Sequence, residues 1–346
     1  MASQKNTILY VGNQLSAHGY TPTNIETLGP QLGQFYNVVA VSSKKNKILR
    51  LLDICQTVWK YRKKAKLLLI DTYSTSAFKF AQAAGYFACK FGIPYIPILH
   101  GGDLPKKLKT ATPTELRFFE KAHTLVAPSP FLRHQFSEFG FKKVLFIPNN
   151  IDLAQYPFKK RETIAPKLLW VRSFHKIYNA NMAIEVLHQL LQTHPNACLC
   201  MVGPDKDGSL QTAQQLAQTL GVAQQVRFTG KMSRQEWHAV AKEYDIVINT
   251  TTVDNTPISV VEAMALGLPV ISTNVGGIPY LLTHQKNALL VPSANVQAMV
   301  QQVERLVAEP GLAMQLTVEA REMVKSFDWE TVQHTWKSLI DAAIAQ

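Results

Sequence analysis

Short runs of apolar, often β-branched residues alternate along the chain with longer segments whose apolar residues recur every three or four positions. The short runs predict strands, and their continuous apolar character is typical of parallel strands buried on both faces. The longer segments predict the helices that cover such sheets. In the first half, the predicted strands are residues 7–13, 37–42, 66–74, 94–101, 124–129 and 144–150, and the predicted helices include 76–91, 113–122 and 130–139.

The second half repeats this alternation. Its predicted strands are residues 167–174, 197–203, 226–230, 245–251, 269–273 and 288–293, and its predicted helices are 180–193, 209–219, 233–241, 257–266, 294–306, 310–325 and 328–344. The polar, proline-bounded segment 156–166 separates the two series and predicts a domain boundary. We therefore expect an α/β protein with two doubly wound, Rossmann-like parallel-sheet domains. Ligands of such sheets bind beyond the carboxyl ends of the strands, so we expect the two domains to face one another across a ligand-binding cleft.

The net positive charge of the chain lies entirely in its first half. The chain has 346 residues, 47% of them hydrophobic, and a formal net charge of +12. Residues 1–155 hold 20 Lys and Arg against 8 Asp and Glu, whereas residues 156–346 hold 16 of each. Such a basic half indicates either an anionic partner or a solubilising surface.

Other compositional signals concern the compartment. The four cysteines (Cys55, Cys89, Cys198 and Cys200) form neither a CxxC pair nor a metal-ligand spacing, which favours a reduced compartment. The amino terminus lacks the pattern of a signal peptide, and no apolar stretch approaches the roughly 20 residues of a membrane-spanning helix. We therefore expect a cytoplasmic protein, soluble or peripheral on the inner face of a membrane.

The richest motif is DNTPISVVEAMALGLPVISTNVGGIP, residues 254–279. Thr256 as the N-cap and a proline at the first helical position predict a short helix with free backbone amides at its start. Such a helix end binds a phosphate. Asp254 and Glu262 lie beside that end, where acidic groups are unfavourable unless they bind hydroxyls, such as those of a ribose and a sugar. The alternative is a capped helix with a buried glutamate.

A second motif, WVRSFHKIYN, follows the first strand of the second half. Arg172 and Lys176 are four residues apart at this strand end, where two cations can hold a diphosphate. The alternative is a pair of solvated surface cations.

Together these motifs resemble those of the retaining GT-B glycosyltransferases, family 4-like (glycosyl transferases group 1). That family carries two acidic residues separated by seven others, and here the pair is Asp254 and Glu262. The resemblance implies that Glu262 binds the donor ribose and that Asp254 lies near the donor sugar. It also implies that the amides of Ile258 and Ser259 bind the β-phosphate. Further residues expected around the donor are Thr256, Gly203 and Gly230.

The resemblance also assigns residues of the first half. Gly12, Asn13 and Gly19 lie where the family has a glycine-rich acceptor-side loop, although their spacing is not that of a dinucleotide fingerprint. His100 ends a predicted strand, where a histidine is either structural or catalytic, and the resemblance implies an active-site role near the donor sugar. Asp103 follows it and is expected to contact the acceptor or the loop backbone.

By this resemblance the chain divides into two functional domains. Residues 1–155 form an acceptor-binding domain, joined by the C-terminal helix 328–346, and residues 160–327 form a nucleotide-sugar-binding domain. The expected catalytic residues are Asp254, His100, Arg172 and Lys176. The expected reaction is transfer of a hexosyl group, with retention, from a UDP- or GDP-sugar to an acceptor hydroxyl in the synthesis of cell-surface glycans or glycolipids. No metal or other cofactor is expected.

Two alternatives remain. A nucleotide-sugar epimerase or a phosphorylase is compatible with the same fold. A non-catalytic protein that binds nucleotides or nucleic acid through its basic half is the second, although no nucleic-acid recognition motif supports it.

The basic half also contains a candidate membrane surface. Residues 44–66 predict a helix with a basic flank that includes Arg50, and its apolar residues are Ile48, Leu51, Leu52, Cys55, Val58 and Trp59. This pattern is typical either of a helix lying on an anionic membrane or of an ordinary helix facing the core. Residues 106–109 add a second basic cluster. The expected partners are therefore a nucleotide-sugar, a glycan or lipid-linked acceptor and an anionic membrane surface, but no nucleic acid.

Overall fold

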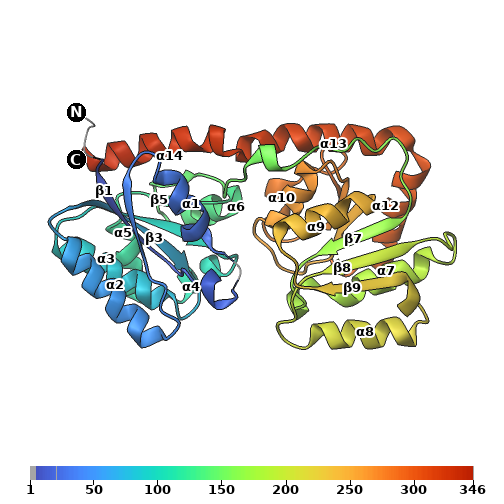
Figure 1. The fold of residues 1–346 in the computed structure, drawn as a ribbon, viewed down its shortest axis with the longest axis horizontal. Helices are drawn as coiled ribbons and strands as arrows, with labels where there is room; N and C mark the ends of the chain where they lie inside the picture. Colours follow the sequence, from blue (N-terminus) through green and yellow to red (C-terminus); the bar gives the residue numbers. More distant parts are fainter. Residues whose placement is uncertain (1–4, 21, 346) are drawn as a thin grey trace. The chain divides into compact units, whose positions relative to one another are not determined.

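The computed structural model describes residues 5–20 and 22–345 and divides the chain into two compact units. Unit 1 comprises Met1–Asn150 and Trp329–Gln346, and unit 2 comprises Ile151–Asp328. The two units are shown in Figure 1, and each is described by itself.

Unit 1 is built on a six-stranded parallel sheet in the order β2-β1-β3-β4-β5-β6. Its strands are β1 (Thr7–Val11), β2 (Asn37–Val41), β3 (Ala65–Tyr73), β4 (Tyr95–His100), β5 (Leu125–Ala127) and β6 (Val144–Phe146). The chain adds β2 on one side of β1 and β3 on the other. The β1/β3 boundary is therefore a topological switch point, where the loops after the strands diverge and leave room for a ligand.

The helices of unit 1 cover both faces of this sheet (Figure 1). One face carries α2 (Lys47–Tyr61), α3 (Phe78–Lys90), α4 (Leu104–Lys109), α5 (Pro113–Glu120) and α6 (Pro130–Glu138). The other carries α1 (Asn24–Leu32) and the C-terminal α14 (Trp329–Ile344). Because Trp336 and Ile340 of α14 are buried against the strands of unit 1, the end of the chain completes the first unit.

Unit 2 has a second six-stranded parallel sheet, in the order β12-β11-β10-β7-β8-β9. Its strands are β7 (Lys167–Val171), β8 (Cys198–Val202), β9 (Val226–Gly230), β10 (Ile246–Asn249), β11 (Val270–Thr273) and β12 (Leu289–Val291). Here the switch point lies between β7 and β10, so the loops after these two strands are the expected ligand loops.

The helices of unit 2 are divided between two cores, one on each face of the sheet. The first core includes residues of α7 (Ala180–Leu190), α8 (Ser209–Thr219) and α12 (Val296–Ala308). The second includes residues of α9 (Arg234–Val240), α10 (Ile258–Ala265) and α11 (Ile278–Leu281). The long helix α13 (Pro310–Val324) contributes to both.

The segment between the two sheets is packed into unit 2 rather than exposed as a polar linker. Unit 2 begins at Ile151, four residues before the end of the predicted first domain, and the Ile151 amide donates to the Phe327 carbonyl at 2.9 Å. Tyr156 is buried in the core of unit 2. Arg161, only 5% exposed, donates to backbone carbonyls that include those of Gly267 and Tyr244. This arginine therefore satisfies buried backbone carbonyls of unit 2.

Candidate functional site

Arg172 is the central cation of the switch point in unit 2. It directly follows β7, and its guanidinium forms an ion pair with the carboxylate of Asp254, which lies in the loop after β10. The same guanidinium lies 3.9 Å from the centroid of the Tyr178 ring, a cation–π contact. Both charged side chains are largely buried. The structure therefore brings together two of the predicted site residues, Arg172 and Asp254. They follow β7 and β10, which are adjacent in the sheet but distant in the sequence.

Gly203 allows the end of β8 to lie directly against the backbone of Arg172. Gly203 follows β8 with a φ of +151°, and a Cβ there would lie 1.8 Å from the Arg172 carbonyl oxygen. The Gly203 amide donates to the Gly230 carbonyl at 2.8 Å, which ties the ends of β8 and β9 together. Of these two predicted donor-site glycines, Gly203 therefore packs against the main chain that carries Arg172, and Gly230 is joined to Gly203.

The loops after β10 and β11 approach each other just as closely. The Gly277 amide donates to the Asp254 carbonyl at 2.9 Å, and a Cβ at Gly276 would lie 2.3 Å from that same oxygen. A Cβ at Gly277 would lie 2.1 Å from the Asn255 carbonyl oxygen. The double glycine thus fixes the loop that holds Asp254.

The helix that begins beside Asp254 starts one residue later than predicted. Pro257, rather than Thr256, is the N-cap of α10, and no side chain caps the helix. The capping role predicted for Thr256 is therefore wrong. The Val260 and Val261 amides donate to the Pro257 carbonyl at 3.0 and 3.2 Å. The Ile258 and Ser259 amides precede them at the helix start, where the helix itself offers no acceptor.

Glu262 lies one turn further along α10 and is buried. Its Oε1 atom accepts hydrogen bonds from Tyr156 Oη at 2.9 Å and from Arg234 Nε at 2.7 Å. Burial raises the pKa of the Glu262 carboxyl, although Arg234 and Tyr156 both oppose this rise. Burial likewise raises the pKa of Asp254 against the opposing charge of Arg172. The prediction from the sequence did not include Tyr156 or Arg234, because neither lies in the motif.

Lys176 is placed differently from Arg172. It begins a short 3₁₀ turn, Lys176–Tyr178, and its backbone amide donates to Asp207 Oδ2 at 3.0 Å. Its side chain is exposed. Arg172 therefore lies inside the site as part of an ion pair, whereas Lys176 lies at its edge with its ammonium in solvent.

In unit 1, a carboxylate that the sequence analysis missed organises the site. Asp71 is buried on β3, and its Oδ1 atom accepts from His100 Nε2 at 2.9 Å and from Tyr10 Oη at 3.1 Å. The His100 ring stacks on Tyr73, with centroids 4.9 Å apart. A Cβ at Gly12 would lie 2.6 Å from Asp71 Oδ2. Only glycine therefore fits at position 12 beside this carboxylate. The signal in the sequence was a single acidic residue inside an apolar strand.

The remaining acceptor-side residues occupy the surrounding loops. Asn13 Oδ1 accepts from Arg50 Nη1 at 2.7 Å, and Gly19, with a φ of +82°, ends a 3₁₀ turn. Asp103 is exposed at the start of α4. Arg50, which the sequence suggested for the basic flank of its helix, is instead buried at 6% exposure because it binds Asn13 and the Lys44 carbonyl.

No cluster of three or more His, Cys, Asp or Glu side chains with the geometry of a metal site occurs among residues 5–20 and 22–345. Within those same ranges, no helix is both long enough and apolar enough to cross a bilayer.

Two family descriptions together match most of the chain. Residues 4–155 match Glycosyltransferase Family 4, and residues 155–323 match Glycosyl transferases group 1. A glycogen synthase of Mycobacterium tuberculosis is 26% identical over 196 residues, which cover 56% of this chain and 47% of that protein. A GDP-mannose-dependent alpha-(1-6)-phosphatidylinositol monomannoside mannosyltransferase of the same organism is 32% identical over 137 residues, 38% of this chain and 34% of that protein. The chain thus spans less than half the length of these relatives.

Solved structures with similar folds cover almost the whole chain. A sucrose-phosphate synthase from Thermosynechococcus elongatus aligns with a TM-score of 0.79 at 15% identity, over 99% of this chain and 100% of the other. The Anabaena HepE protein in complex with UDP aligns with a TM-score of 0.76 at 17% identity, over 97% of this chain and 100% of the other. With both halves matched and the two Rossmann-like sheets in place, the chain belongs to the family 4-like glycosyltransferases of group 1, which have the GT-B fold.

Proposed function

We propose that the chain is a retaining, metal-independent glycosyltransferase that moves a hexosyl group from a nucleotide-sugar to an acceptor hydroxyl. The observation that carries this proposal is the Arg172–Asp254 pair at the switch point of unit 2, beside the uncapped start of α10. An arginine and free helix amides are suited to a diphosphate, and the buried Glu262 on the same helix is suited to ribose hydroxyls. Unit 2 would therefore hold the donor.

The reaction follows from the charges around this diphosphate. The bond between the anomeric carbon and the diphosphate oxygen breaks, and a bond to the acceptor oxygen forms on the same face of the sugar. The acceptor proton passes to the departing phosphate oxygen. Arg172 and the amides of Ile258 and Ser259 would stabilise the negative charge that grows on this leaving group. Lys176, whose side chain is exposed at the edge of the site, would join them when donor is bound.

The donor class rests on the diphosphate site and on the relatives. HepE was solved with UDP and with UDP-glucose, and the mannosyltransferase relative is named as GDP-mannose-dependent. We therefore propose a UDP- or GDP-hexose as the donor.

The acceptor is proposed to be a glycan or a lipid-linked molecule at an anionic membrane, in the synthesis of cell-surface glycans or glycolipids. Unit 1 carries the basic excess, and α2 exposes a row of apolar side chains to solvent. Ile48 is 71% exposed and Leu52 is 59% exposed, while Ile54 and Val58 face the core. The predicted apolar face of this helix is therefore divided, and its exposed part supports membrane contact. Lys106 and Lys109 are exposed in the second basic cluster, whereas Lys107 pairs with Glu115 at 2.7 Å.

The test of the transferase proposal begins with a screen for donor hydrolysis over common UDP- and GDP-sugars in the presence of a chelator. With the donor that is consumed, folded Glu262→Ala and Arg172→Ala/Lys176→Ala variants should lose most of the transfer activity. Arg227→Ala and Glu243→Ala are matched controls, because these two side chains form an exposed surface pair of the same unit.

Full activity in the Glu262 and Arg172/Lys176 variants would exclude this site as the donor site. NMR of the first product formed should show the anomeric configuration of the donor, and the opposite configuration would exclude retention. Conversion of the nucleotide-sugar without any acceptor would favour an epimerase instead. Salt-dependent binding of RNA or DNA without sugar transfer would favour the non-catalytic alternative.

Membrane contact is tested by flotation with anionic vesicles at low salt. Ile48→Ser/Leu52→Ser should reduce binding, whereas Val318→Ser, also an exposed apolar residue but on unit 2, should leave it unchanged. Absence of binding by the unmodified chain would exclude this part of the proposal.

A further inference from the structure

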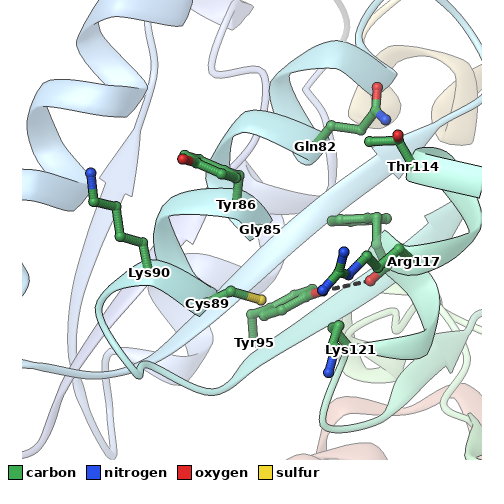
Figure 2. Close-up of a pocket in the computed structure, with 10 residues that line it drawn as sticks. Gln82, Gly85, Tyr86, Cys89, Lys90, Tyr95, Thr114, Arg117 and Lys121 are labelled. Atoms are coloured by element: carbon green, nitrogen blue, oxygen red, sulfur yellow. Dashed lines mark hydrogen bonds between the residues drawn. The ribbon is translucent and has the colours of Figure 1, made fainter.

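Unit 1 contains a hollow of about 740 Å³ between α3, α5 and the start of β4. This volume lies within the range of small-molecule sites. Figure 2 shows Tyr86 and Lys90 on the α3 side, and Arg117 and Lys121 on the α5 side. None of these residues belongs to the candidate site described above.

The hollow lies at the opposite edge of the sheet from that site. Tyr95, which lines the hollow, is the first residue of β4, and His100 is the last. At a rise of about 3.3 Å per residue, the strand separates the two residues by about 16 Å. The helices that return along a parallel sheet end at this same edge, so the C-terminal ends of α2, α3 and α5 all point towards it.

The wall of the hollow is apolar and tightly held. The Tyr95 and Phe118 rings stack with centroids 5.6 Å apart, and Tyr95 Oη donates to the Phe118 carbonyl at 2.6 Å. Gly85 permits this packing, because a Cβ there would lie 2.7 Å from the Phe118 ring. A preformed wall of this kind loses little conformational entropy when it binds an apolar group.

The rim is cationic. Lys90, Arg117 and Lys121 line the hollow, and no Asp or Glu does. Within the part of the chain that the structure describes, none of these three cations takes part in an ion pair. Each of these cations lies at the C-terminal end of a helix, where a positive charge interacts favourably with the helix dipole. Together they form a cluster over an apolar wall, which is complementary to a molecule with an anionic head and an apolar tail.

We propose that this hollow binds the headgroup of one anionic phospholipid, with its phosphate among Lys90, Arg117 and Lys121. Tyr86, 65% exposed at the mouth, would lie at the boundary between headgroups and acyl chains, where tyrosine is favoured. The inference rests on the membrane association proposed for unit 1, and it adds recognition of a single lipid to that general attraction.

The surface beside the hollow agrees with this assignment. Helix α2 packs along α3 on the same face of the sheet (Figure 1), and it exposes Leu52 and Trp59. It is followed by the basic run Arg62-Lys63-Lys64. Exposed apolar side chains insert into a lipid surface, and a neighbouring basic run is attracted to anionic headgroups. Binding of α2 to the membrane would therefore place the hollow at the level of the lipid phosphates.

Cys89 offers a direct readout, since it lines the hollow and is exposed. The full chain is treated with a maleimide in the presence of dihexanoyl-phosphatidylglycerol below its micelle concentration. The modified peptides are then quantified by mass spectrometry. At a lipid concentration ten times the dissociation constant, modification of Cys89 should slow about tenfold, because only the free fraction reacts. Cys198, half-buried in unit 2, is the internal control and should react at an unchanged rate.

Comparison ligands identify the chemistry that is recognised. Dihexanoyl-phosphatidylcholine, with the same chains and no net charge, should protect Cys89 far less. Inorganic phosphate at the same concentration should also protect it far less. Equal protection by phosphatidylcholine would overturn the anionic preference, equal protection by phosphate would overturn the lipid assignment, and no protection by any ligand would overturn the site.

Surface variants separate this site from the proposed activity. Arg117→Gln/Lys121→Gln should abolish protection by phosphatidylglycerol, whereas Lys142→Gln/Lys143→Gln, exposed elsewhere in unit 1, should not. Donor hydrolysis should be unchanged in both, because the hollow is at the far edge of the sheet. Persistent protection in Arg117→Gln/Lys121→Gln would overturn the proposal. If the unmodified chain showed no transferase activity at all, the proposed function would be overturned. The lipid site would still be tested independently, because protection of Cys89 does not depend on that activity.

Discussion

His100 Nε2 lies 2.9 Å from Asp71 Oδ1, across the carboxyl ends of two adjacent strands. A carboxylate oxygen accepts hydrogen bonds, so in this contact the His100 Nε2 atom is the donor. The Tyr73 ring stacks on the imidazole. Asp71 is therefore a positioning residue that fixes the tautomer and the orientation of the histidine expected near the donor sugar.

Replacement of Asp71 by asparagine should lower kcat for sugar transfer by about 10–100-fold while leaving the chain folded. The reason is that a hydrogen bond to a charged group contributes about 1.5–3 kcal/mol, and the amide removes the charge but keeps the shape. The donor KM should change little, because the proposed diphosphate contacts lie on unit 2. Steady-state kinetics of Asp71→Asn check this, with Tyr10→Phe as control. Tyr10→Phe removes the other donor to Oδ1 and retains the charge, so an equal loss of kcat in both variants would contradict a role of the Asp71 charge.

Gly203→Ala should destroy the geometry around Arg172. The Cβ would lie 1.8 Å from the Arg172 carbonyl oxygen, so the strand end must move. We expect a marked fall in the melting temperature and loss of nucleoside diphosphate binding, measured by thermal unfolding and calorimetry. Gly221→Ala is the matched control, since Gly221 also has a positive φ, of +71°, but a Cβ there would meet no atom within 4 Å. That variant should cost about 1 kcal/mol and bind normally. Normal binding by a folded Gly203→Ala chain would contradict the expectation.

The alternation of apolar and polar residues was sufficient to predict both sheets. Every predicted strand overlaps a strand of the structure, because parallel strands buried on both faces leave a continuous apolar signal. The helix α1 was missed, since Pro30 and Gly29 lie inside it and weaken its helical pattern. Its start is marked by Thr23 and Glu26, which form a capping box. In α2 the period was correct, but the identity of the core-facing side was not evident, because Arg50 is buried while Ile48 is exposed.

Only those site residues that lie together in one sequence motif could be predicted. Asp254, Glu262 and the helix between them are local in sequence, and the family resemblance selects them. The partners of these residues depend on the strand order, which places β7 beside β10 and thereby Arg172 beside Asp254. Tyr156 reaches Glu262 across 106 residues of sequence. Such long-range contacts leave no periodic signal in a single sequence.

Tyr156→Phe should shift the pH dependence of donor binding upward. Burial already raises the pKa of Glu262, and the Tyr156 hydroxyl opposes that rise by donating to the carboxylate. Without the hydroxyl, the pKa of Glu262 should rise further, so that protonation begins at a higher pH. If ionised Glu262 binds the ribose, nucleoside diphosphate affinity should fall at a higher pH in the variant than in the unmodified chain. Calorimetric titrations from pH 8 to pH 5 measure this. Tyr244→Phe, also in unit 2, should leave the profile unchanged, and identical profiles in Tyr156→Phe and the unmodified chain would refute the coupling.

His238 makes the stability of unit 2 sensitive to acid. It is buried on α9, its ring centroid lies 4.8 Å from that of Tyr156, and its Nε2 atom has no hydrogen-bond partner among the described residues. Burial lowers the pKa of His238 to about 4, and the nearby Arg234 charge adds to this effect. In the unfolded chain a histidine has a pKa of about 6.5. Above that value both states are neutral. Between about 6.5 and 4 the unfolded state binds a proton that the folded state does not.

Stability should therefore fall as the pH drops through this window, and His238→Phe should reduce that fall. Phenylalanine keeps an aromatic ring against Tyr156 and removes the titration. Between pH 7.5 and pH 5 the unmodified chain should lose about 1–2 kcal/mol of unfolding free energy more than the variant does. Urea unfolding at the two pH values, followed by the fluorescence of the neighbouring Trp237, measures the difference. Other groups with shifted pKa values, such as Glu262, titrate in both proteins and largely cancel. His194→Gln is the control and should retain the full pH dependence, whereas the same acid loss in His238→Phe as in the unmodified chain would show that the buried imidazole does not determine it.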